Sequence, residues 1–518
     1  MAHGPAAGPG TPSPAHENML PSPQAVAGAA LDCFAALPRT GKPQAHEHTV
    51  LAAIVLSTPT PHCPPTLCVA ALATGTKCLG ASARDPGGAA LNDCHAEVLA
   101  RRAFLLFLHA HARDLGSQGA VNPLCRDEEG GGGCGAPRLR LRPGVGVHLY
   151  VSQPPCGDAC VHDAEGREAA HGSAGGTLGE ARSQENAASA SDDREVLGKT
   201  GCTLSEKHKQ DNPPPTRTLP RTGAKLLGLE SQEQALGTAP ATIPEPHTRP
   251  QASGHLRRKP GRGEGTLSMS CSDKLARWRL LGLQGGLWSR LLAAPLALDS
   301  VTVHVPRGAG ADATLRALRR AVVDRVAPAA AAAALGVEAL PPAPALRVLP
   351  ADAAAEALGL APGPARRSAA GGCLLWHALP GGAAAGVPRG ALEGLTGVLG
   401  LRSGHKRKLG EGIRPSAASA ASRLRLGRSF VDLLRLLQAG GAGEDAAGVQ
   451  RAGDLELPGA ATMVSGPRPA LLSYGEVKAR CGGEYYERWA GLRRHAFFEH
   501  WIPKPPAELH LDVSGLCL

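Results

Sequence analysis

The sequence predicts an α/β fold. Short apolar runs of strand length alternate along the chain with stretches that have the periodicity of helices. The chain has 518 residues, of which 43% are hydrophobic, so much of it can fold around one large core. Aromatic residues make up only 3% of the chain, and the core must therefore consist mainly of Leu, Val and Ala.

Composition divides the chain into a tail, a domain and an insertion. Residues 1–44 are rich in Pro, Gly and Ala, and we expect a disordered tail there. Residues 163 to about 255 are rich in Ser, Gly, Ala, Glu and Pro and contain few large apolar groups. Such a segment cannot bury enough apolar surface to fold, so we expect a long disordered insertion. The domain should thus span residues 45–518 and be interrupted by this insertion.

The expected strands share a short apolar run that ends in turn or polar residues. They lie at 48–58, 66–78, 145–152, 298–306 and 371–379. The third is the clearest, because Val145, Val147, Leu149 and Val151 alternate along it as they should in a strand.

The expected helices share an apolar face at helical spacing. They lie at 92–111, 268–292, 313–326, 421–437 and 474–501. Asn92 or Asp93 can cap the first of them. Residues 326–346 are Ala-rich and interrupted by Pro and Glu, which is typical of a surface helix and linker and not of a membrane span.

Charge and cysteine content narrow the class of protein. Lys and Arg number 55 and Asp and Glu 45, a net charge of 55 − 45 = +10, which favours a polyanionic partner such as nucleic acid. The same charge is also compatible with simple solubility. The 14 cysteines are scattered, and the first residues lack the pattern of a signal peptide. We therefore expect an intracellular protein with free thiols and no membrane segment. Nothing decides between nucleus and cytosol.

Two separated motifs carry the chemistry. His95 and Glu97 stand where the helix at 92–111 should begin, and the segment QPPCGDAC (153–160) follows the strand at 145–152. H-x-E followed by P-C-x-x-C is the signature of zinc nucleobase deaminases, in which His and Cys hold Zn²⁺ and the Glu moves protons. Cys156 is then the second ligand. From the residues alone, the third ligand is either Cys160 or Cys271.

Five blocks in the same order resemble the adenosine deaminases that act on RNA. The blocks are LATGTKC (72–78), LNDCHAEVLARR (91–102), PPCGDA (154–159), RKPGRGEGT (258–266) and SMSCSDKLARWRLLGLQG (268–285). The resemblance implies a cytidine-deaminase-like mixed sheet flanked by helices, with extra C-terminal helices. It also implies that Cys271 is the third zinc ligand and that Cys160 lies nearby without binding the metal.

The resemblance implies a reaction as well. Zinc with three protein ligands keeps a fourth position for water and lowers the pKa of that water to roughly 7. Glu97 would accept the proton of the water, which attacks C6 of adenine, and would then protonate N1 and the leaving amine. Ammonia departs and inosine remains.

The substrate implied by the resemblance is tRNA. About 45 residues precede the first strand, too few for a double-stranded-RNA-binding domain, and the segments RTGAK (221–225) and 484–506 look more like the tRNA-specific branch. That branch modifies the adenosine 3′ of the anticodon, position 37, in tRNA-Ala. Thr76, Lys77 and Glu264 match positions that in related editors touch the flipped nucleotide or fill its vacancy.

A set of mostly cationic and aromatic residues needs a separate explanation. Exposed salt-bridged faces would explain it, but the resemblance implies that these positions bind inositol hexakisphosphate inside the fold. They are Asn92, Arg101, Arg102, Lys259, Lys274, Arg277, Trp278, Arg423, Tyr474, Lys478, Tyr485, Trp501 and Lys504. The chain departs from the family pattern at Arg279, Gly286 and Trp489.

Three other functions remain open from the sequence. One is an RNA-binding protein with an inactive deaminase fold, and the second is an adenosine editor of other structured RNA. A free-nucleoside or cytidine deaminase is the third, although 518 residues are excessive for so small a substrate. No required protein partner is indicated.

Overall fold

A computed structural model describes most of the domain. The described residues are 20–115, 122–127, 138–162, 223–227, 252–261, 264–305, 310–350, 352–362, 368–384, 387–407, 411–439, 473–495 and 497–512.

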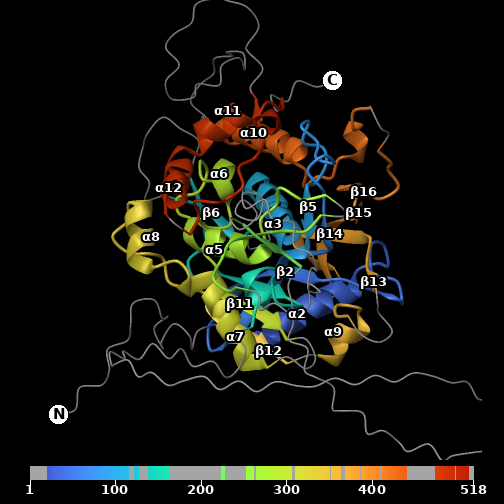
Figure 1. Ribbon diagram of the computed structural model, residues 1–518. Helices are drawn as coiled ribbons and strands as arrows, with labels where there is room; N and C mark the ends of the chain where they lie inside the picture. The colour runs from blue at the N-terminus through green and yellow to red at the C-terminus, as the bar shows by residue number, and fades with distance from the viewer. Residues whose placement is uncertain are drawn as a thin grey trace, which may run out of the picture. The chain divides into compact units, whose positions relative to one another are not determined.

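The centre of the fold is a mixed eight-stranded sheet, as the sequence predicted (Figure 1). In spatial order its strands are β12 (Ala345–Leu349), β11 (Ser300–His304), β8 (Gly146–Val151), β2 (Leu51–Thr60), β3 (Cys63–Thr74), β14 (Gly372–Ala384), β15 (Val387–Thr396) and β16 (Leu401–Arg402). The pairs β12–β11 and β11–β8 are parallel, and the remaining neighbours are antiparallel. Every strand expected from the sequence contributes to this sheet, with shifted ends.

Helices cover both faces of the central strands. β2 is buried at seven consecutive positions, Leu51–Ser57, which requires cover on both sides because neighbouring side chains of a strand point to opposite faces. Two helices pack on β2 and β3: α2 (Pro23–Ala36) and α3 (Ala96–Arg113). In Figure 1 they lie on either side of β2.

The remaining elements surround this sheet. The short strands are β1 (Glu47–His48), β4 (Thr76–Cys78), β5 (Asp93–His95), β6 (Leu124–Arg126), β7 (Leu139–Leu141), β9 (Lys225–Leu226), β10 (Arg257–Arg258) and β13 (Ser368–Ala369). The helices and helical turns are η1 (Asp158–Cys160), α5 (Cys271–Leu281), α6 (Gly285–Trp288), α7 (Ala311–Arg319), η2 (Arg320–Asp324), α8 (Pro328–Leu335), α9 (Ala353–Ala357), η3 (Pro415–Ala417), α10 (Arg423–Ala439), α11 (Tyr474–Cys481), α12 (Gly483–Arg493) and η4 (Pro506–Glu508).

The N-terminal segment corrects one prediction. Residues 1–44 were expected to be a disordered tail, but Pro23–Ala36 form α2, whose Val26, Ala30 and Phe34 are completely buried. The helix begins after Ser22, which caps it by accepting a hydrogen bond from the Ala25 amide at 3.1 Å. The high Pro, Gly and Ala content obscured an Ala-rich apolar face. Residues 1–19 lie outside the described part.

The predicted insertion also needs a correction at its end. Most of residues 163–255 lie outside the described part of the chain. However, β9 pairs antiparallel with β10, and the Gly254 amide donates to Asp158 Oδ1 at 2.7 Å. Residues 223–227 and 252–255 therefore belong to the folded domain, because they complete hydrogen bonds with it.

Helix ends differ from the sequence prediction where tertiary contacts intervene. Asp93–His95 form β5, so α3 starts at Ala96 and neither Asn92 nor Asp93 is its cap. The stretch 268–292 divides into α5 and α6 after Gly282, whose φ of +80° ends the first helix. No helix in the described part of the chain is both long and apolar enough to cross a membrane.

Candidate metal centre and catalytic site

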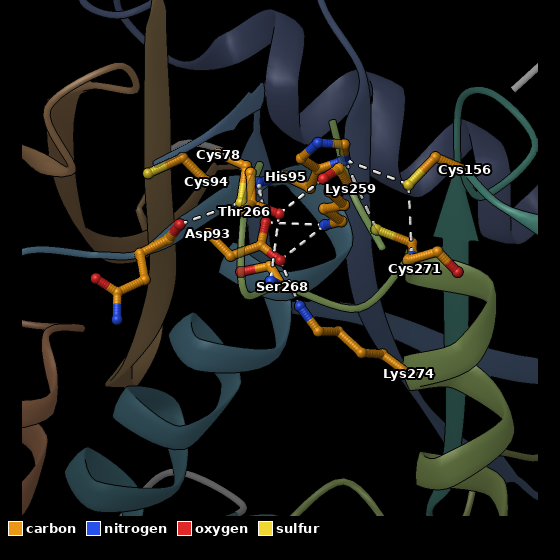
Figure 2. Close-up of polar contacts among 12 residues, drawn as sticks. Cys78, Asp93, Cys94, His95, Cys156, Lys259, Thr266, Ser268, Cys271 and Lys274 are labelled. Carbon is orange, nitrogen blue, oxygen red and sulfur yellow. Dashed lines mark hydrogen bonds and ion pairs between the residues drawn. The ribbon is translucent and has the colours of Figure 1, made fainter. Parts of the chain in front are cut away.

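Three side chains from distant parts of the chain converge on one point. His95 Nδ1 lies 3.7 Å from Cys156 Sγ and 3.7 Å from Cys271 Sγ, and all three atoms lie within 4.8 Å of one another. Figure 2 shows the imidazole and the two thiols pointing toward one another. These are the three ligands that sequence analysis and the resemblance nominated, and they form the group of possible metal ligands found in the described part of the chain.

The spacing of these atoms fits zinc. In a tetrahedral site with Zn–N of about 2.05 Å and Zn–S of about 2.3 Å, nitrogen and sulfur lie about 3.6 Å apart. Two thiolates and an imidazole are also the soft donor set that zinc prefers. Three protein ligands leave the fourth tetrahedral position for a reacting molecule, which is the pattern of catalytic sites.

Backbone pairing fixes His95. β4 and β5 pair antiparallel, with Thr76 opposite His95. Gly75, just before β4, accepts a hydrogen bond from the Ala96 amide at 3.0 Å. A Cβ at Gly75 would lie 2.0 Å from the Cys94 carbonyl oxygen, so only glycine permits this approach. These contacts fix His95 at the end of β5, directly before the first turn of α3.

The two cysteines are held by direct contact between their segments. Cys271 is the first residue of α5, whose cap Ser270 accepts from the Asp273 amide at 3.2 Å. The Cys271 amide donates to Cys156 Sγ at 3.4 Å, and the Ser272 amide donates to the Cys156 carbonyl at 3.0 Å. Two segments 115 residues apart are therefore joined at the metal ligands themselves.

The electrostatic surroundings of Cys156 and Cys271 favour a thiolate at Cys156. The hydrogen bond with Cys271 and the nearby His95 hold the pKa of the Cys156 thiol well below its ordinary value despite burial. Burial and the neighbouring Cys156 raise the pKa of Cys271. Metal binding supplies the positive charge that deprotonates both.

Cys160, the alternative third ligand, lies outside the group. Its thiol donates to the Pro154 and Pro155 carbonyls at 3.4 and 3.3 Å and so faces the backbone of its own loop. Cys271 takes the place that the literal P-C-x-x-C pattern would have given to Cys160.

Glu97 is buried in the first turn of α3, with 3% of its surface exposed. Burial, followed by the charge of Cys156, raises the pKa of its carboxyl group. A carboxyl whose pKa is raised toward neutrality can both accept and return a proton. The helix dipole favours the carboxylate form at this position.

Behind His95 lies a charged group that sequence analysis did not identify. Asp93 accepts from Lys259 Nζ at 2.8 Å on both oxygens, contacts Lys274 Nζ, and accepts from the His95 amide at 3.1 Å (Figure 2). Although burial opposes the charged form, the two ammonium groups lower the pKa of Asp93. The only signal in the sequence was its position two residues before a ligand.

Of the three residues predicted to touch substrate, Thr76 directly adjoins a candidate metal ligand. Thr76 pairs with His95, and its buried hydroxyl lacks a hydrogen-bond partner. Lys77 donates to the Ala369 carbonyl at 3.1 Å. Glu264 is exposed and accepts from the amide of Ser82 at 3.0 Å and from its hydroxyl at 2.6 Å.

A second polar cavity, of about 140 Å³, is lined by most of the residues predicted to bind inositol hexakisphosphate. These are Arg101, Arg102, Arg277, Trp278, Tyr474, Lys478, Tyr485 and Lys504. The cations repel one another there. The nearby Lys478, with burial, holds the pKa of Lys504 well below its ordinary value.

The other predicted ligands of that cofactor are not among the lining residues. They are Asn92, Lys259, Lys274, Arg423 and Trp501. The two lysines bind Asp93. Arg423 contacts the Glu508 side chain and donates to its backbone carbonyl at 3.2 Å, and Asn92 Nδ2 lies 3.5 Å from Glu508 Oε1. The Trp501 ring packs against Trp489 at 5.0 Å.

Two departures from the family pattern have a structural explanation. A Cβ at Gly286 would lie 2.5 Å from Tyr486 Oη, so this tyrosine, which sequence analysis missed, occupies the space that a larger side chain would need. The Trp489 ring centroid lies 3.9 Å from the guanidinium carbon of Arg277 and holds that cation over its face. Arg279 is buried, with unpartnered Nε and Nη1 atoms, and nothing in the structure explains it.

Comparisons with known proteins agree with this site. The family model for the adenosine-deaminase (editase) domain matches residues 71–505. A Drosophila melanogaster tRNA-specific adenosine deaminase 1 is 33% identical over 60% of this chain and 60% of its own length. The Mus musculus protein of the same name is 28% identical over 91% of this chain and 95% of its own. A Mus musculus double-stranded RNA-specific adenosine deaminase is 29% identical, but over only 18% of its length.

Proposed function

Because the chain belongs to the adenosine-deaminase (editase) domain family, we propose that it hydrolyses adenosine to inosine in tRNA. One observation carries the proposal: Glu97, a buried carboxylate in the first turn of α3, interacts electrostatically with Cys156 and His95, two of the three candidate metal ligands. We further propose that the target is the adenosine 3′ of the anticodon, position 37, of tRNA-Ala. The tRNA-specific relatives support this choice, because two of them align over nearly their whole length.

His95, Cys156 and Cys271 would hold the zinc ion. When bound, zinc acts as a Lewis acid and lowers the pKa of water in its open position. Glu97 supplies the proton transfers. Its carboxylate accepts a proton from the attacking water as the oxygen adds to C6 of adenine, and passes it to N1. Glu97 then takes the second proton from the hydroxyl on C6 and gives it to the amine, so the C6–amine bond breaks, ammonia leaves and the carbonyl of inosine remains.

An anticodon loop suits an active site whose catalytic carboxylate, Glu97, is buried. The adenine must leave its stack to reach Glu97, which costs a few kcal/mol in a duplex and less in a loop. Thr76 borders the site and Lys77 follows it in the same strand, so we propose that both contact the nucleotide. Glu264 is exposed and accepts from the Ser82 hydroxyl, and we propose that it touches the flipped nucleotide or fills its vacancy.

The test is to incubate the protein with total tRNA and to map inosine by sequencing. We expect inosine at position 37 of tRNA-Ala and none with Glu97→Gln. This variant should retain zinc and fold while its turnover falls by about 10²- to 10⁴-fold. A wild-type protein that binds tRNA without forming inosine would support an inactive RNA-binding protein, and inosine in other structured RNA would support a different editor.

We also propose that the cation-lined cavity holds inositol hexakisphosphate. Five of its lining residues, Arg101, Arg102, Arg277, Lys478 and Lys504, are Arg or Lys, and none of the lining residues is Asp or Glu. Like charges so close together repel one another, so a compact polyanion fits the cavity. Denatured protein from cells that make this phosphate should release one molecule per chain. Release of none, with full stability, would refute the proposal.

The thiols support an intracellular location. The cysteines of the described part of the chain are all free, and Cys33, Cys94, Cys271, Cys373 and Cys481 are buried. We infer a reducing compartment, because free thiols persist there.

A further inference from the structure

Each cysteine of the metal centre is followed two residues later by a completely buried aspartate. Asp158 follows Cys156, and Asp273 follows Cys271; both aspartates are 0% exposed. Gly157, between Cys156 and Asp158, has a φ of +108°, and a Cβ there would lie 2.3 Å from Ser270 Oγ. Only glycine fits this turn, which sets the direction of the aspartate relative to the cysteine.

One arginine from a third part of the chain contacts both aspartates. Arg325 immediately follows η2, and its amide donates to the Arg320 carbonyl at 3.2 Å. Its Nη2 lies 2.9 Å from Asp273 Oδ1, and its Nη1 lies 3.9 Å from Asp158 Oδ2. The side chain is 3% exposed, and its guanidinium carbon lies 4.5 Å from the Phe497 ring centroid. The guanidinium is therefore enclosed between the two cysteine-bearing segments and an aromatic ring.

The other contacts of the aspartates hold each segment by itself. Asp158 accepts from Arg320 Nε at 3.2 Å and from the Gly254 amide. Asp273 accepts from its own cap, Ser270, at 2.7 Å and from the Arg257 amide at 2.9 Å. These contacts fix each aspartate in its loop. Arg325 is the cation that the structure places against both carboxylates at once.

Loss of this guanidinium would act on the spacing of the sulfurs. Asp273 would keep no ion pair among those described, and Asp158 would keep the one with Arg320. Breaking a buried pair from one side is strongly unfavourable. Because Arg325 is paired with an aspartate of each segment, its loss would also remove a constraint on the separation of Cys156 Sγ and Cys271 Sγ.

We propose that Arg325 is a positioning residue of the metal centre, which sets the separation of Cys156 and Cys271 through Asp158 and Asp273. Arg325 does not touch metal or substrate. The inference rests on the metal centre of the proposed function but not on its RNA substrate.

The test measures metal affinity apart from activity. Apo-protein is titrated with Zn²⁺ against a competing chelator, and with Co²⁺ to follow thiolate-to-cobalt absorption. We expect Arg325→Met to weaken zinc binding by about 10- to 100-fold, the range found when partners of metal ligands are removed. Arg325→Lys keeps the charge but lacks the fork that spans two carboxylates, so it should weaken binding by about 10-fold. Because Arg319→Met removes an exposed arginine of the same helical segment, it should leave both titrations unchanged.

A further variant tests the charge argument. Arg325→Met combined with Asp158→Asn and Asp273→Asn should recover zinc affinity relative to Arg325→Met alone, because the uncompensated charges are gone. If Arg325→Met fails to fold, Arg325→Lys still decides the matter. Zinc Kd and cobalt spectra of Arg325→Lys equal to those of the wild type, with only the Tm lowered, would overturn the proposal. A wild-type protein that binds zinc tightly but forms no inosine would instead refute the proposed reaction.

Discussion

The metal centre and the cation-lined cavity differ in the source of their counter-charges. Around the metal centre the protein provides both signs, since Asp93 binds Lys259 and Lys274, and Asp273 binds Arg325. In the cavity, the lining residues provide cations alone. The chain therefore supplies counter-charges around the metal centre, whereas the residues that line the cavity supply none.

The pKa values show the same difference. Asp93 has a lowered pKa, because its ammonium neighbours outweigh burial. Lys504 also has a lowered pKa, but here the first cause is the like charge of Lys478. In the first region the neighbours stabilise the charged form, and in the second they destabilise it.

The largest effect should come from removing a metal ligand. Cys271→Ser should lose zinc, and turnover should fall by at least about 10⁴-fold, because nothing then lowers the pKa of water from 15.7. Cys160→Ser is the matched control and should keep both zinc and activity. Metal analysis and an inosine assay measure this. Zinc loss confined to Cys160→Ser would make Cys160 the third ligand.

The next effect concerns the cavity. Inositol hexakisphosphate at about 1,000 times its Kd should stabilise the wild-type protein by about 4 kcal/mol. Lys504→Met should be more stable than the wild type without the phosphate, because a repulsive charge is gone, and should gain less when it is added. Thermal unfolding of both proteins, with and without the phosphate, tests whether the variant is more stable alone and gains less from the phosphate. If the variant is less stable in both conditions, the cations do not repel one another.

A smaller effect should follow from filling the space beside Tyr486. Gly286→Ala should lower the free energy of unfolding by about 1–3 kcal/mol, because its Cβ overlaps the tyrosine ring. Tyr486→Ala in the same chain should remove this penalty. Urea unfolding of the two single variants and the double variant measures the coupling, and strictly additive effects would contradict the assigned overlap.

The smallest effect is a pH dependence of phosphate binding. The empty cavity holds the pKa of Lys504 low, mainly through Lys478, and a bound polyanion raises it again. When the phosphate binds, Lys504 therefore takes up a proton at pH values between its lowered pKa and about 10.4. Affinity should fall as pH rises in that interval, by up to about 1.4 kcal/mol per pH unit for one proton. Calorimetry in buffers of different ionisation enthalpy detects the uptake, and proton release would contradict it.

Local patterns predicted much of this molecule. Five of the eight strands of the sheet were predicted from apolar runs, whereas β12, β15 and β16 were not. Helix α2 was missed, because Ala-rich composition resembles a tail until the sheet surface that it covers is known. The predicted end of the insertion, at about residue 255, was too late, because residues 252–255 belong to the folded domain. Their contacts depend on partners distant in sequence, which the sequence does not reveal.

By itself the sequence indicated the candidate metal ligands His95 and Cys156, the candidate proton carrier Glu97, and two possible third ligands, Cys160 and Cys271. Short motifs are enough to identify such residues, because each motif places a characteristic side chain at the start of a helix or after the end of a strand. Only the tertiary structure decided what surrounds them: Asp93 between two lysines, Arg325 between two aspartates, and Tyr486 in the space beside Gly286. Such contacts join residues tens to hundreds of positions apart, and their strength depends on burial, which no local spacing records.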